Sequence, residues 1–378
     1  MDLLLSILTL LTVLAAALQL TRSSAWWIRA LDFPLAQFAA WTGLLLLARC
    51  LVLPETAWRF ALETSLLILI LAALLRRIWP YTPLHARETR RAEDPPANTR
   101  LRLLISNVLM TNRNAAPLIE AVKREAPDVL IALETDTWWQ SQLDTLDPSY
   151  PHTLKCPLDN LYGMHIYSRL PLGEAHIDYL IEEDIPSMHV CLRLGNGRGV
   201  RLHALHPRPP GPEGNDTSGE RDAELIVVAK AVRGHKEPVI VAGDLNDVAW
   251  SPTTRLFRKI SQLLDPRIGR GPAPTFPAAY PFLRWPLDHL FHSADFSLVE
   301  LKRLGPIGSD HLPILVDLAL NEETRPDQTR TAIAEEEDRA WARQIVRQED
   351  VSAADVPEPD TAPGNTKKPD PVSGPGSG

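Results

Sequence analysis

Acidic, amide and imidazole side chains follow several β-type runs of this 378-residue sequence. Asn107 follows the run LRLLIS, and Glu134 directly follows the apolar run DVLIAL. A carboxylate placed at the end of a buried strand suits a hard cation such as Mg²⁺ or Mn²⁺, because these ions prefer oxygen ligands. Taken alone, Asn107 fits an ordinary turn at the end of a strand better than a site, and Glu134 fits either equally well.

A stronger signal lies in PVIVAGDLND, where a buried strand runs directly into Gly243 and Asp244. Asp244 and Asn246 are two residues apart, so both can face one phosphate and its attacking water. An Asx-type turn is the alternative interpretation of this run. His206 ends the run VRLHALHP, and a single histidine before proline is more often structural than catalytic.

Two Asp-His dipeptides lie further along, Asp288-His289 in PLDHLF and Asp310-His311 in GSDHLPI. An aspartate commonly fixes the tautomer of a histidine and stabilises its charged form. Two such pairs beside β-type sequence indicate a charge-supported imidazole next to a phosphate.

The elements that must position these residues form one α/β domain at residues 100–320. Short β-type runs alternate there with amphipathic segments, and residues 114–125 and 220–233 are expected to be helices. The expected strands are LRLLISNVLM, DVLIALET, HIYSRL, MHVCLRL, VRLHALHP, EPVIVAGDL, LDHLFHS and PILVDLAL. Polar side chains at the ends of such strands meet in a shared crevice.

The remaining sequence divides by composition. Three apolar runs, Leu3–Leu20, Phe33–Leu53 and Trp58–Leu75, predict a three-helix transmembrane region within residues 1–79. A signal peptide is the alternative for the first run, but Asp2 stands where a basic residue is expected. Residues 80–99 are expected to be a solvated juxtamembrane linker. Residues 321–378 are expected to be a charged, Pro/Gly-rich tail, largely disordered apart from one segment that could be helical.

Arginines on either side of the apolar runs predict which side of the membrane the domain occupies. With three spans, Arg22 and Arg29 lie on the same side as Arg76 and Arg77, which places the α/β domain in the cytoplasm. The sequence therefore predicts a multi-pass integral membrane protein whose partner is the lipid bilayer. No protein partner is indicated. Of the three cysteines, only Cys156 and Cys191 could pair, and nothing in their spacing requires it.

The chemical residues occur in the order SNV, ET, HP, GDLN, LDH and GSDHLP, all within residues 100–320. This ordered set resembles the endonuclease/exonuclease/phosphatase superfamily, which has the deoxyribonuclease-I-like fold. The resemblance implies a four-layer α/β sandwich with two mixed β-sheets. It also implies a metal-dependent phosphoesterase, in which Mg²⁺ or Mn²⁺ is bound by Glu134, with Asn107 and Asp310 at or near the ion.

The same resemblance implies roles for the remaining residues. Asp244 would orient or deprotonate the attacking water, and Asn246 would hold the scissile phosphate. His311 would stabilise charge on the phosphate oxygens, with Asp288 orienting it, and His206 would contact the phosphate from the other side. Leu109 departs from the pattern of many nucleases of this superfamily, which carry an acidic residue at that position, so a single-metal site is the expected arrangement.

The charge of the chain indicates which class of substrate to expect. The net charge of −8 excludes a generally basic nucleic-acid-binding surface, and the loop after His206 is rich in proline, glycine and acids. Arg267, Arg270 and Arg284 flank the next loop and could contact an anionic group, or could simply be solvated. The favoured substrate is a lipid or small phosphate ester. A nuclease and a catalytically silent membrane scaffold are the alternatives.

Overall fold

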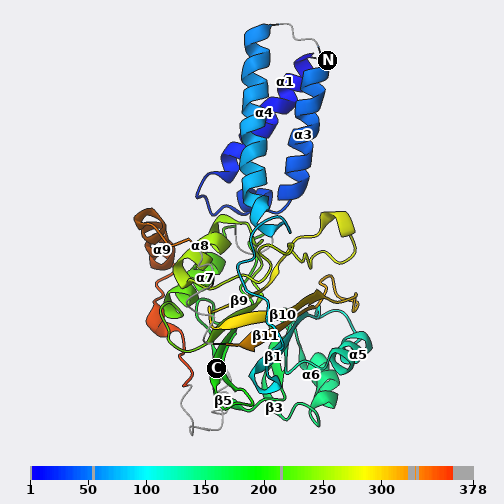
Figure 1. The fold of residues 1–378 in the computed structure, drawn as a ribbon, viewed down its shortest axis with the longest axis vertical. Helices are drawn as coiled ribbons and strands as arrows, with labels where there is room; N and C mark the ends of the chain where they lie inside the picture. The colour runs from blue at the N-terminus through cyan, green and yellow to red at the C-terminus, as the bar shows by residue number, and fades with distance from the viewer. Residues whose placement is uncertain (1, 53–55, 213–215, 322–327, 329–331, 361–378) are drawn as a thin grey trace, which may run out of the picture.

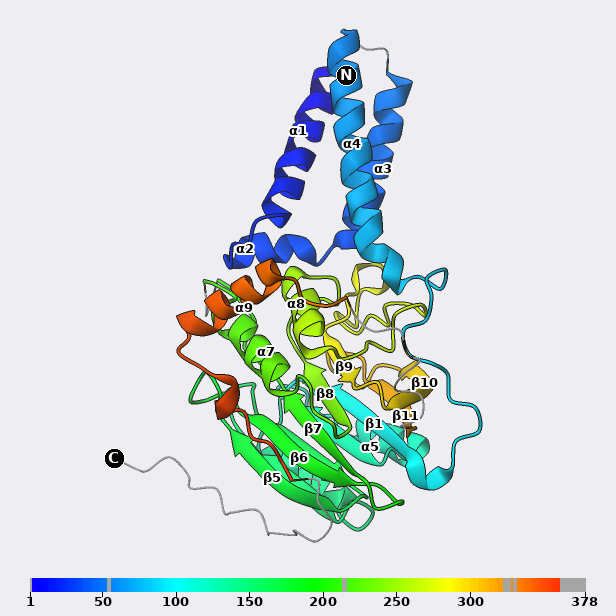
Figure 2. The same ribbon diagram turned by 60° about the vertical axis from the view of Figure 1, so that its left-hand side comes forward.

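The computed structural model describes residues 2–52, 56–212, 216–321, 328 and 332–360. A helical bundle stands on one end of an α/β domain (Figures 1 and 2). The bundle and the segment that follows it contain α1 (Asp2–Gln19), α2 (Trp26–Arg29), η1 (Ala30–Asp32), α3 (Leu35–Leu51), α4 (Ala57–Ile78), η2 (Trp79–Tyr81) and η3 (Ala97–Thr99).

Two mixed sheets form the α/β domain. The strand order is β10-β11-β1-β2-β4-β3 in one sheet and β5-β6-β7-β8-β9 in the other. Each sheet has one parallel pair, β1 with β2 and β7 with β8, and the other pairs are antiparallel. The strands are β1 (Arg100–Asn107), β2 (Val129–Leu133), β3 (His152–Cys156), β4 (Met164–Ser168), β5 (Leu172–Asp178), β6 (Ser187–Arg193), β7 (Gly199–Leu205), β8 (Val239–Asp244), β9 (Asp288–His292), β10 (Phe296–Arg303) and β11 (Ile314–Leu320).

The main hydrophobic core lies between the two sheets. Leu103 and Ile105 of β1 pack there with Leu202 of β7 and Ile240 of β8, whereas Leu104 points to the outer face. This alternation follows from the two-residue period of a strand. On that outer face lie α5 (Ala116–Glu125), α6 (Thr137–Leu143) and η4 (Asp144–Leu146). The other sheet is covered by α7 (Gly219–Ala231), α8 (Pro252–Ser261) and α9 (Glu336–Gln348). The expectation of two mixed sheets with outer helices is confirmed.

The helical bundle exposes apolar side chains on its outer face and buries several polar ones, beside a small leucine cluster, between its helices. Leucines such as Leu10, Leu44 and Leu69 are more than half exposed, whereas Thr42 and Arg49 are buried between the helices. The exposed leucines make the outer face compatible with an apolar surrounding. By length and composition, α1 and the helix starting at Ala57 can each cross a membrane. Within the second expected span, Phe33–Leu53, the helix covers Leu35–Leu51. It is long and apolar enough to cross a membrane only together with the preceding Trp26–Asp32, from which it is bent by 73°.

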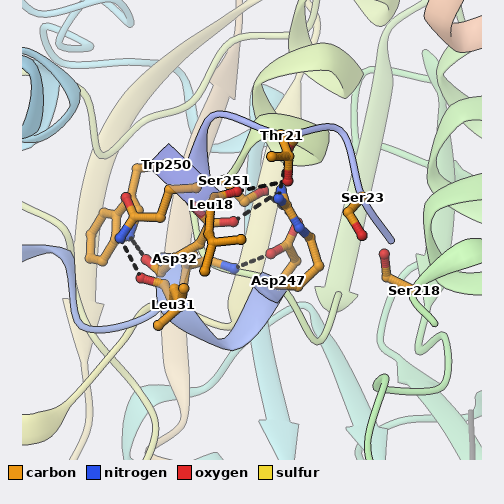
Figure 3. Close-up of polar contacts among 12 residues, drawn as sticks. Leu18, Thr21, Ser23, Leu31, Asp32, Ser218, Asp247, Trp250 and Ser251 are labelled. Carbon is orange, nitrogen blue, oxygen red and sulfur yellow. Dashed lines mark hydrogen bonds and ion pairs between the residues drawn. The ribbon is translucent and has the colours of Figure 1, made fainter. Parts of the chain in front are cut away.

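The bundle packs directly on the loop that follows β8. The buried indole of Trp250 donates from Nε1 to the carbonyl of Asp32, at 2.8 Å (Figure 3). The carboxylate of Asp32 accepts a hydrogen bond from Arg77 Nη2 at 2.7 Å and pairs with Arg29 Nη1 at 3.2 Å. Tyr81 Oη donates to the carbonyl of Ala249, at 2.7 Å. These contacts join α4 and the loop between α1 and α3 to one edge of the domain.

The segments on either side of the domain are more structured than the sequence indicates. Within residues 80–99, Arg87 and Arg91 are exposed as a linker predicts, but Glu88 is buried and accepts two hydrogen bonds from Arg258 Nη2, at 2.6 and 2.7 Å. Beyond residue 321, α9 buries Ile345 and Val346 against α7, and η7 (Ala353–Asp355) follows it. The rest of the expected disordered tail, residues 361–378, lies outside the described residues. All three cysteines are free.

Candidate active site

The carboxyl ends of the two parallel strand pairs lie at one edge of the sheets, and most of the candidate residues are found there. Asn107 ends β1 and Glu134 follows β2, whereas His206 follows β7 and Asp244 ends β8. Parallel neighbours end at the same edge, so these four side chains converge although they are far apart in sequence. Asp288 begins β9, which runs antiparallel to β8 and is paired with it at Asp244.

Asn107 joins the two sheets at this edge. Its Nδ2 donates to Glu134 Oε1 at 2.8 Å and to Asp244 Oδ2 at 3.1 Å, while its Oδ1 accepts from the backbone N–H of Leu109. Glu134 itself has a left-handed backbone, with φ at 60°. Such a conformation is uncommon outside glycine and asparagine, and it marks a position where local strain accompanies placement of the side chain.

A chain of charges links Asp288, His311 and Asp244. Nδ1 of His311 is hydrogen-bonded to Asp288 Oδ2 at 2.8 Å, and its Nε2 lies 3.5 Å from Asp244 Oδ2. Burial alone would lower the pKa of His311, but the charges of Asp288 and Asp244 outweigh it and raise that pKa to about 10. His311 is therefore an imidazolium at neutral pH, and the Asp-His partnership involves Asp288 and His311 rather than neighbours in sequence.

His206 and Asn246 complete the far side of the site. Nε2 of His206 lies 3.9 Å from Asp244 Oδ2, and burial lowers the His206 pKa to about 4, so this ring is neutral at pH 7. Its Nδ1 is buried without a hydrogen-bond partner. Asn246, with φ at 49°, donates from its backbone N–H to Asp244 Oδ1 and from Nδ2 to the carbonyl of Pro207. The second N–H of that amide is available for a substrate oxygen.

Gly243 explains why the strand can end in this way. Its φ is 142°, and a Cβ at this position would lie 1.9 Å from the carbonyl oxygen of Leu205. Only glycine lets β8 approach β7 so closely at the residue before Asp244.

Buried carboxylates make the site suitable for a cation, and no lysine or arginine among the described residues pairs with Glu134 or Asp244. Burial, together with the charges of Asp244 and Asp310, raises the pKa of Glu134 to about 7 despite the hydrogen bond from Asn107. Burial also raises the pKa of Asp244. A divalent ion would relieve this accumulation of negative charge, so the residues fit a metal with oxygen ligands.

Two sets of residues offer ligand atoms. The sequence indicates Glu134, Asn107 and Asp310 as one set. The structure adds a second set, Asp244, Asp288 and His311, whose ligand atoms all lie within 4.8 Å of one another. In that group the hydrogen bond to Asp288 occupies Nδ1 of His311, and Nε2 faces Asp244 Oδ2 at 3.5 Å. Both the side of the site at Glu134 and the group of Asp244, Asp288 and His311 thus offer ligand atoms to a cation.

Several expected or neighbouring residues lie elsewhere. His289 is buried, with Nε2 against the carbonyl of Asp247 and Nδ1 against Arg267, so it supports the loop rather than the site. Arg267 is itself buried in an ion pair with Asp265, and Arg284 donates to backbone carbonyls. Arg270 lines a separate cavity.

Aromatic side chains that sequence reasoning missed flank the two histidines. The ring of Phe276 lies 4.8 Å from that of His311, and the ring of Tyr162 lies 5.3 Å from that of His206. The backbone N–H of Ala278 also donates to the carbonyl of Asp310, at 2.7 Å. Phe276 and Ala278 belong to a loop without sheet or helix pattern, so no local signal connects them with the site.

Comparison with known proteins identifies the family to which this domain is related. The family model described as Endonuclease/Exonuclease/phosphatase family matches residues 104–311. The chain belongs to this family. A comparison with curated proteins finds no match.

Among solved structures, the chain is similar to an endonuclease/exonuclease/phosphatase from Beutenbergia cavernae DSM 12333, with 20% identity and a TM-score of 0.50 over 59% of this chain and 72% of that one. It is also similar to D. rerio TDP2 complexed with a single-strand DNA product, with 17% identity and a TM-score of 0.50 over 58% and 99%. The human Nocturnin catalytic domain with bound sulfate has 16% identity and a TM-score of 0.48 over 64% and 99%. At these identities the two structures with a TM-score of 0.50 establish the fold alone.

Proposed function

We propose that the protein is a membrane-anchored, divalent-metal-dependent phosphoesterase that hydrolyses a phosphate ester of a lipid. Membership of the endonuclease/exonuclease/phosphatase family supports hydrolysis at phosphorus. The position of the site beside the apolar bundle supports a substrate presented at a membrane. This position is the observation that carries the proposal.

The chemistry follows from the charges at the site. A cation beside Glu134 would neutralise the phosphate oxygens and the developing charge. Asp244, held by Asn107 and by the N–H of Asn246, accepts the proton of the attacking water. The His311 imidazolium, held by Asp288, stabilises negative charge on the phosphate, and the neutral ring of His206 donates or accepts a hydrogen bond opposite it.

The loop that carries Phe276 extends from the site to the foot of the bundle. Phe276 packs on His311, and the tip of the same loop exposes 91% of Phe282 and 62% of Tyr280. Gln37, near the start of α3, donates from Nε2 to the carbonyl of Phe282 at 2.7 Å. Figure 1 shows this yellow loop, residues 272–287, beside the base of the helices. Exposed aromatic side chains at this level suit the interface of a bilayer.

Charge on the bundle supports a cytoplasmic orientation. The loop between α1 and α3 contacts the domain, where the backbone N–H of Ser218 donates to the carbonyl of Ser24. Arg22 and Arg29 therefore lie on the same side as Arg76, Arg77 and the domain. Positive residues favour the cytoplasmic side, so we place the domain there. Protease added to right-side-out vesicles should spare the domain, and digestion would reverse the assignment.

A substrate panel tests the proposal. Full-length protein, reconstituted in phosphatidylcholine vesicles, would be assayed on long-chain phospholipids, on the soluble diester bis(p-nitrophenyl) phosphate and on plasmid DNA, in Mg²⁺, Mn²⁺ or EDTA. We expect the highest turnover on a phospholipid, loss of turnover in EDTA, and loss in Asp244→Asn. Phe282→Ser should lower the ratio of phospholipid to soluble-diester turnover, because it acts on the interface and not on the chemistry.

Plasmid nicking without activity on any lipid would refute the lipid substrate and support the nuclease alternative. Metal-dependent nucleases usually contact several phosphates, so their activity falls steeply with salt. Absence of hydrolysis on every substrate in every metal would support a catalytically silent scaffold.

A further inference from the structure

Four arginines converge on a cavity that shares no residue with the candidate active site. The cavity has a volume of about 510 Å³, and Arg87, Arg91, Arg270 and Arg303 line it together with one acidic residue, Glu300. Arg87 and Arg91 come from the segment after α4, Arg270 from the loop after α8, and Arg303 from the end of β10. Three separate parts of the chain thus bring like charges to one place.

Within the described parts of the chain, no carboxylate forms an ion pair with these arginines. The ion pairs formed among the described residues include none of the four. Glu300 lies 3.9 Å from Arg102 instead. Arg270 Nη2 donates to the carbonyl of Thr89 at 2.6 Å and Arg303 Nη1 to that of Pro274 at 2.9 Å, which fixes these two side chains without cancelling their charge. Burial and the charges of Arg87 and Arg91 lower the pKa of Arg270 to about 10.

The backbone holds this arrangement in place. The N–H of Ala92 donates to the carbonyl of Leu298, and the N–H of Leu298 to that of Arg90, so the segment with Arg91 is paired alongside β10. Gly269, with φ at 74°, packs so closely that a Cβ would lie 2.8 Å from the Cα of Arg87. Figure 2 shows the segment after α4 descending along the domain past β10. The cavity is therefore assembled before a ligand arrives.

We propose that this cavity binds a phosphate-bearing anion. Arginine presents several N–H donors in a planar fork and keeps its charge. Among the described residues that line the cavity, four guanidinium groups stand against one carboxylate, an excess of three positive charges. The cavity begins shortly after α4 ends at Ile78, so the same phosphate chemistry can come from the head group of an anionic phospholipid or from a soluble phosphate.

Two walls of the cavity continue into loops of the candidate active site, so a bound ligand could influence the positions of these loops. The wall that contains Arg270 continues into Thr275 and Phe276, which contact the N–H of Asp288 and the ring of His311. The wall that contains Arg303 continues into the loop with Asp310 and His311, where the N–H of Leu304 donates to the carbonyl of Pro313. A ligand bound by Arg270 and Arg303 at once would therefore link the loop that contains Phe276 to the loop that contains His311.

Binding of inorganic pyrophosphate to the full-length protein in EDTA tests the proposal without hydrolysis. Arg87→Gln/Arg91→Gln removes two exposed guanidinium groups that donate no side-chain hydrogen bond within the described residues, and should weaken binding about tenfold or more. Glu300→Gln removes the opposing charge and should strengthen binding about threefold. Arg233→Gln, an exposed arginine outside the cavity, is the matched control and should leave affinity unchanged.

Nanodiscs separate the two sources of phosphate. If an anionic head group occupies the cavity, discs with phosphatidic acid should block pyrophosphate binding, and discs of phosphatidylcholine alone should permit it. Equal binding in both discs, with the expected effects of the arginine variants, would assign the cavity to a soluble phosphate. Unchanged affinity in both Arg87→Gln/Arg91→Gln and Glu300→Gln would overturn the proposal.

Discussion

Replacing Asp32 with asparagine should destabilise the whole protein, because Asp32 is the polar centre of the contact between the bundle and the domain. Asp32 is buried, and its carboxylate pairs with Arg77 and Arg29, which become uncompensated charges in Asp32→Asn. Breaking a buried ion pair by removing one partner costs about 3–5 kcal/mol. At about 2–4 °C per kcal/mol, the melting temperature in detergent should fall by about 6–20 °C. The hydrogen bond from Trp250 uses the backbone carbonyl of Asp32 and survives the substitution.

The assay is thermal unfolding of detergent-purified protein, followed by tryptophan fluorescence. Asp94→Asn makes the same change at an exposed aspartate and serves as the control. Arg77→Gln and the double variant Asp32→Asn/Arg77→Gln complete a double-mutant cycle. The loss in free energy of unfolding in the double variant should be smaller than the sum of the two single losses by about 1 kcal/mol or more. A shift for Asp32→Asn no larger than that of Asp94→Asn, or losses that simply add, would refute the reasoning.

Two further predictions concern the site and the core. Glu134→Gln should lower turnover by at least about 100-fold. Measured in EDTA, its melting temperature should equal or exceed that of the unsubstituted protein, since the metal-free fold buries a carboxylate whose pKa is raised; a lower melting temperature for the variant in EDTA would indicate a structural role for Glu134 instead. Burial lowers the pKa of His165 from 6.5 to about 3, so the folded protein favours the neutral ring. The contribution of His165 to the free energy of unfolding is therefore complete above pH 6.5 and is lost as the pH falls. Between pH 7 and pH 5 this loss is about 2 kcal/mol. Both ring nitrogens lack a partner, so His165→Leu should flatten the fall of melting temperature with acid, and an unchanged pH profile would contradict this account.

The sequence predicts the strands that carry the site because each is a largely apolar run followed by a polar residue. β2 and β8 are continuous apolar runs, whereas β1 and β7 are interrupted by polar residues such as Arg102 and His203. The elements that it missed have weaker patterns. β5 is half-buried and carries Glu174 and His176, and β10 ends in exposed charged residues, so neither shows the apolar run of an inner strand. α8 begins with Pro252 and is amphipathic, but its start lies too close to the GDLN motif to be separated from it.

Contacts between distant parts of the chain could not be predicted in this way. Asp288 and His311 were matched through the family resemblance, because 23 residues separate them and no local period connects them. The hydrogen bond between Trp250 and Asp32 spans 218 residues, and the cavity formed by Arg87, Arg91, Arg270 and Arg303 depends on three-dimensional packing alone. Hydropathy likewise shows that the first eighty residues are apolar, but not that they cover the loop after Asp244.

The contact of Trp250 and Tyr81 across the base of the bundle limits how freely this protein can be recombined with others. A foreign transmembrane helix fused before residue 98 would bring the domain to a bilayer, yet it would leave the indole N–H of Trp250 and the surface around Ala249 uncovered next to Asp244. The apolar helices and the α/β domain thus form one structural unit. A working chimera would have to exchange both together. Over evolution, substitutions in one part should be accompanied by compensating substitutions in the other.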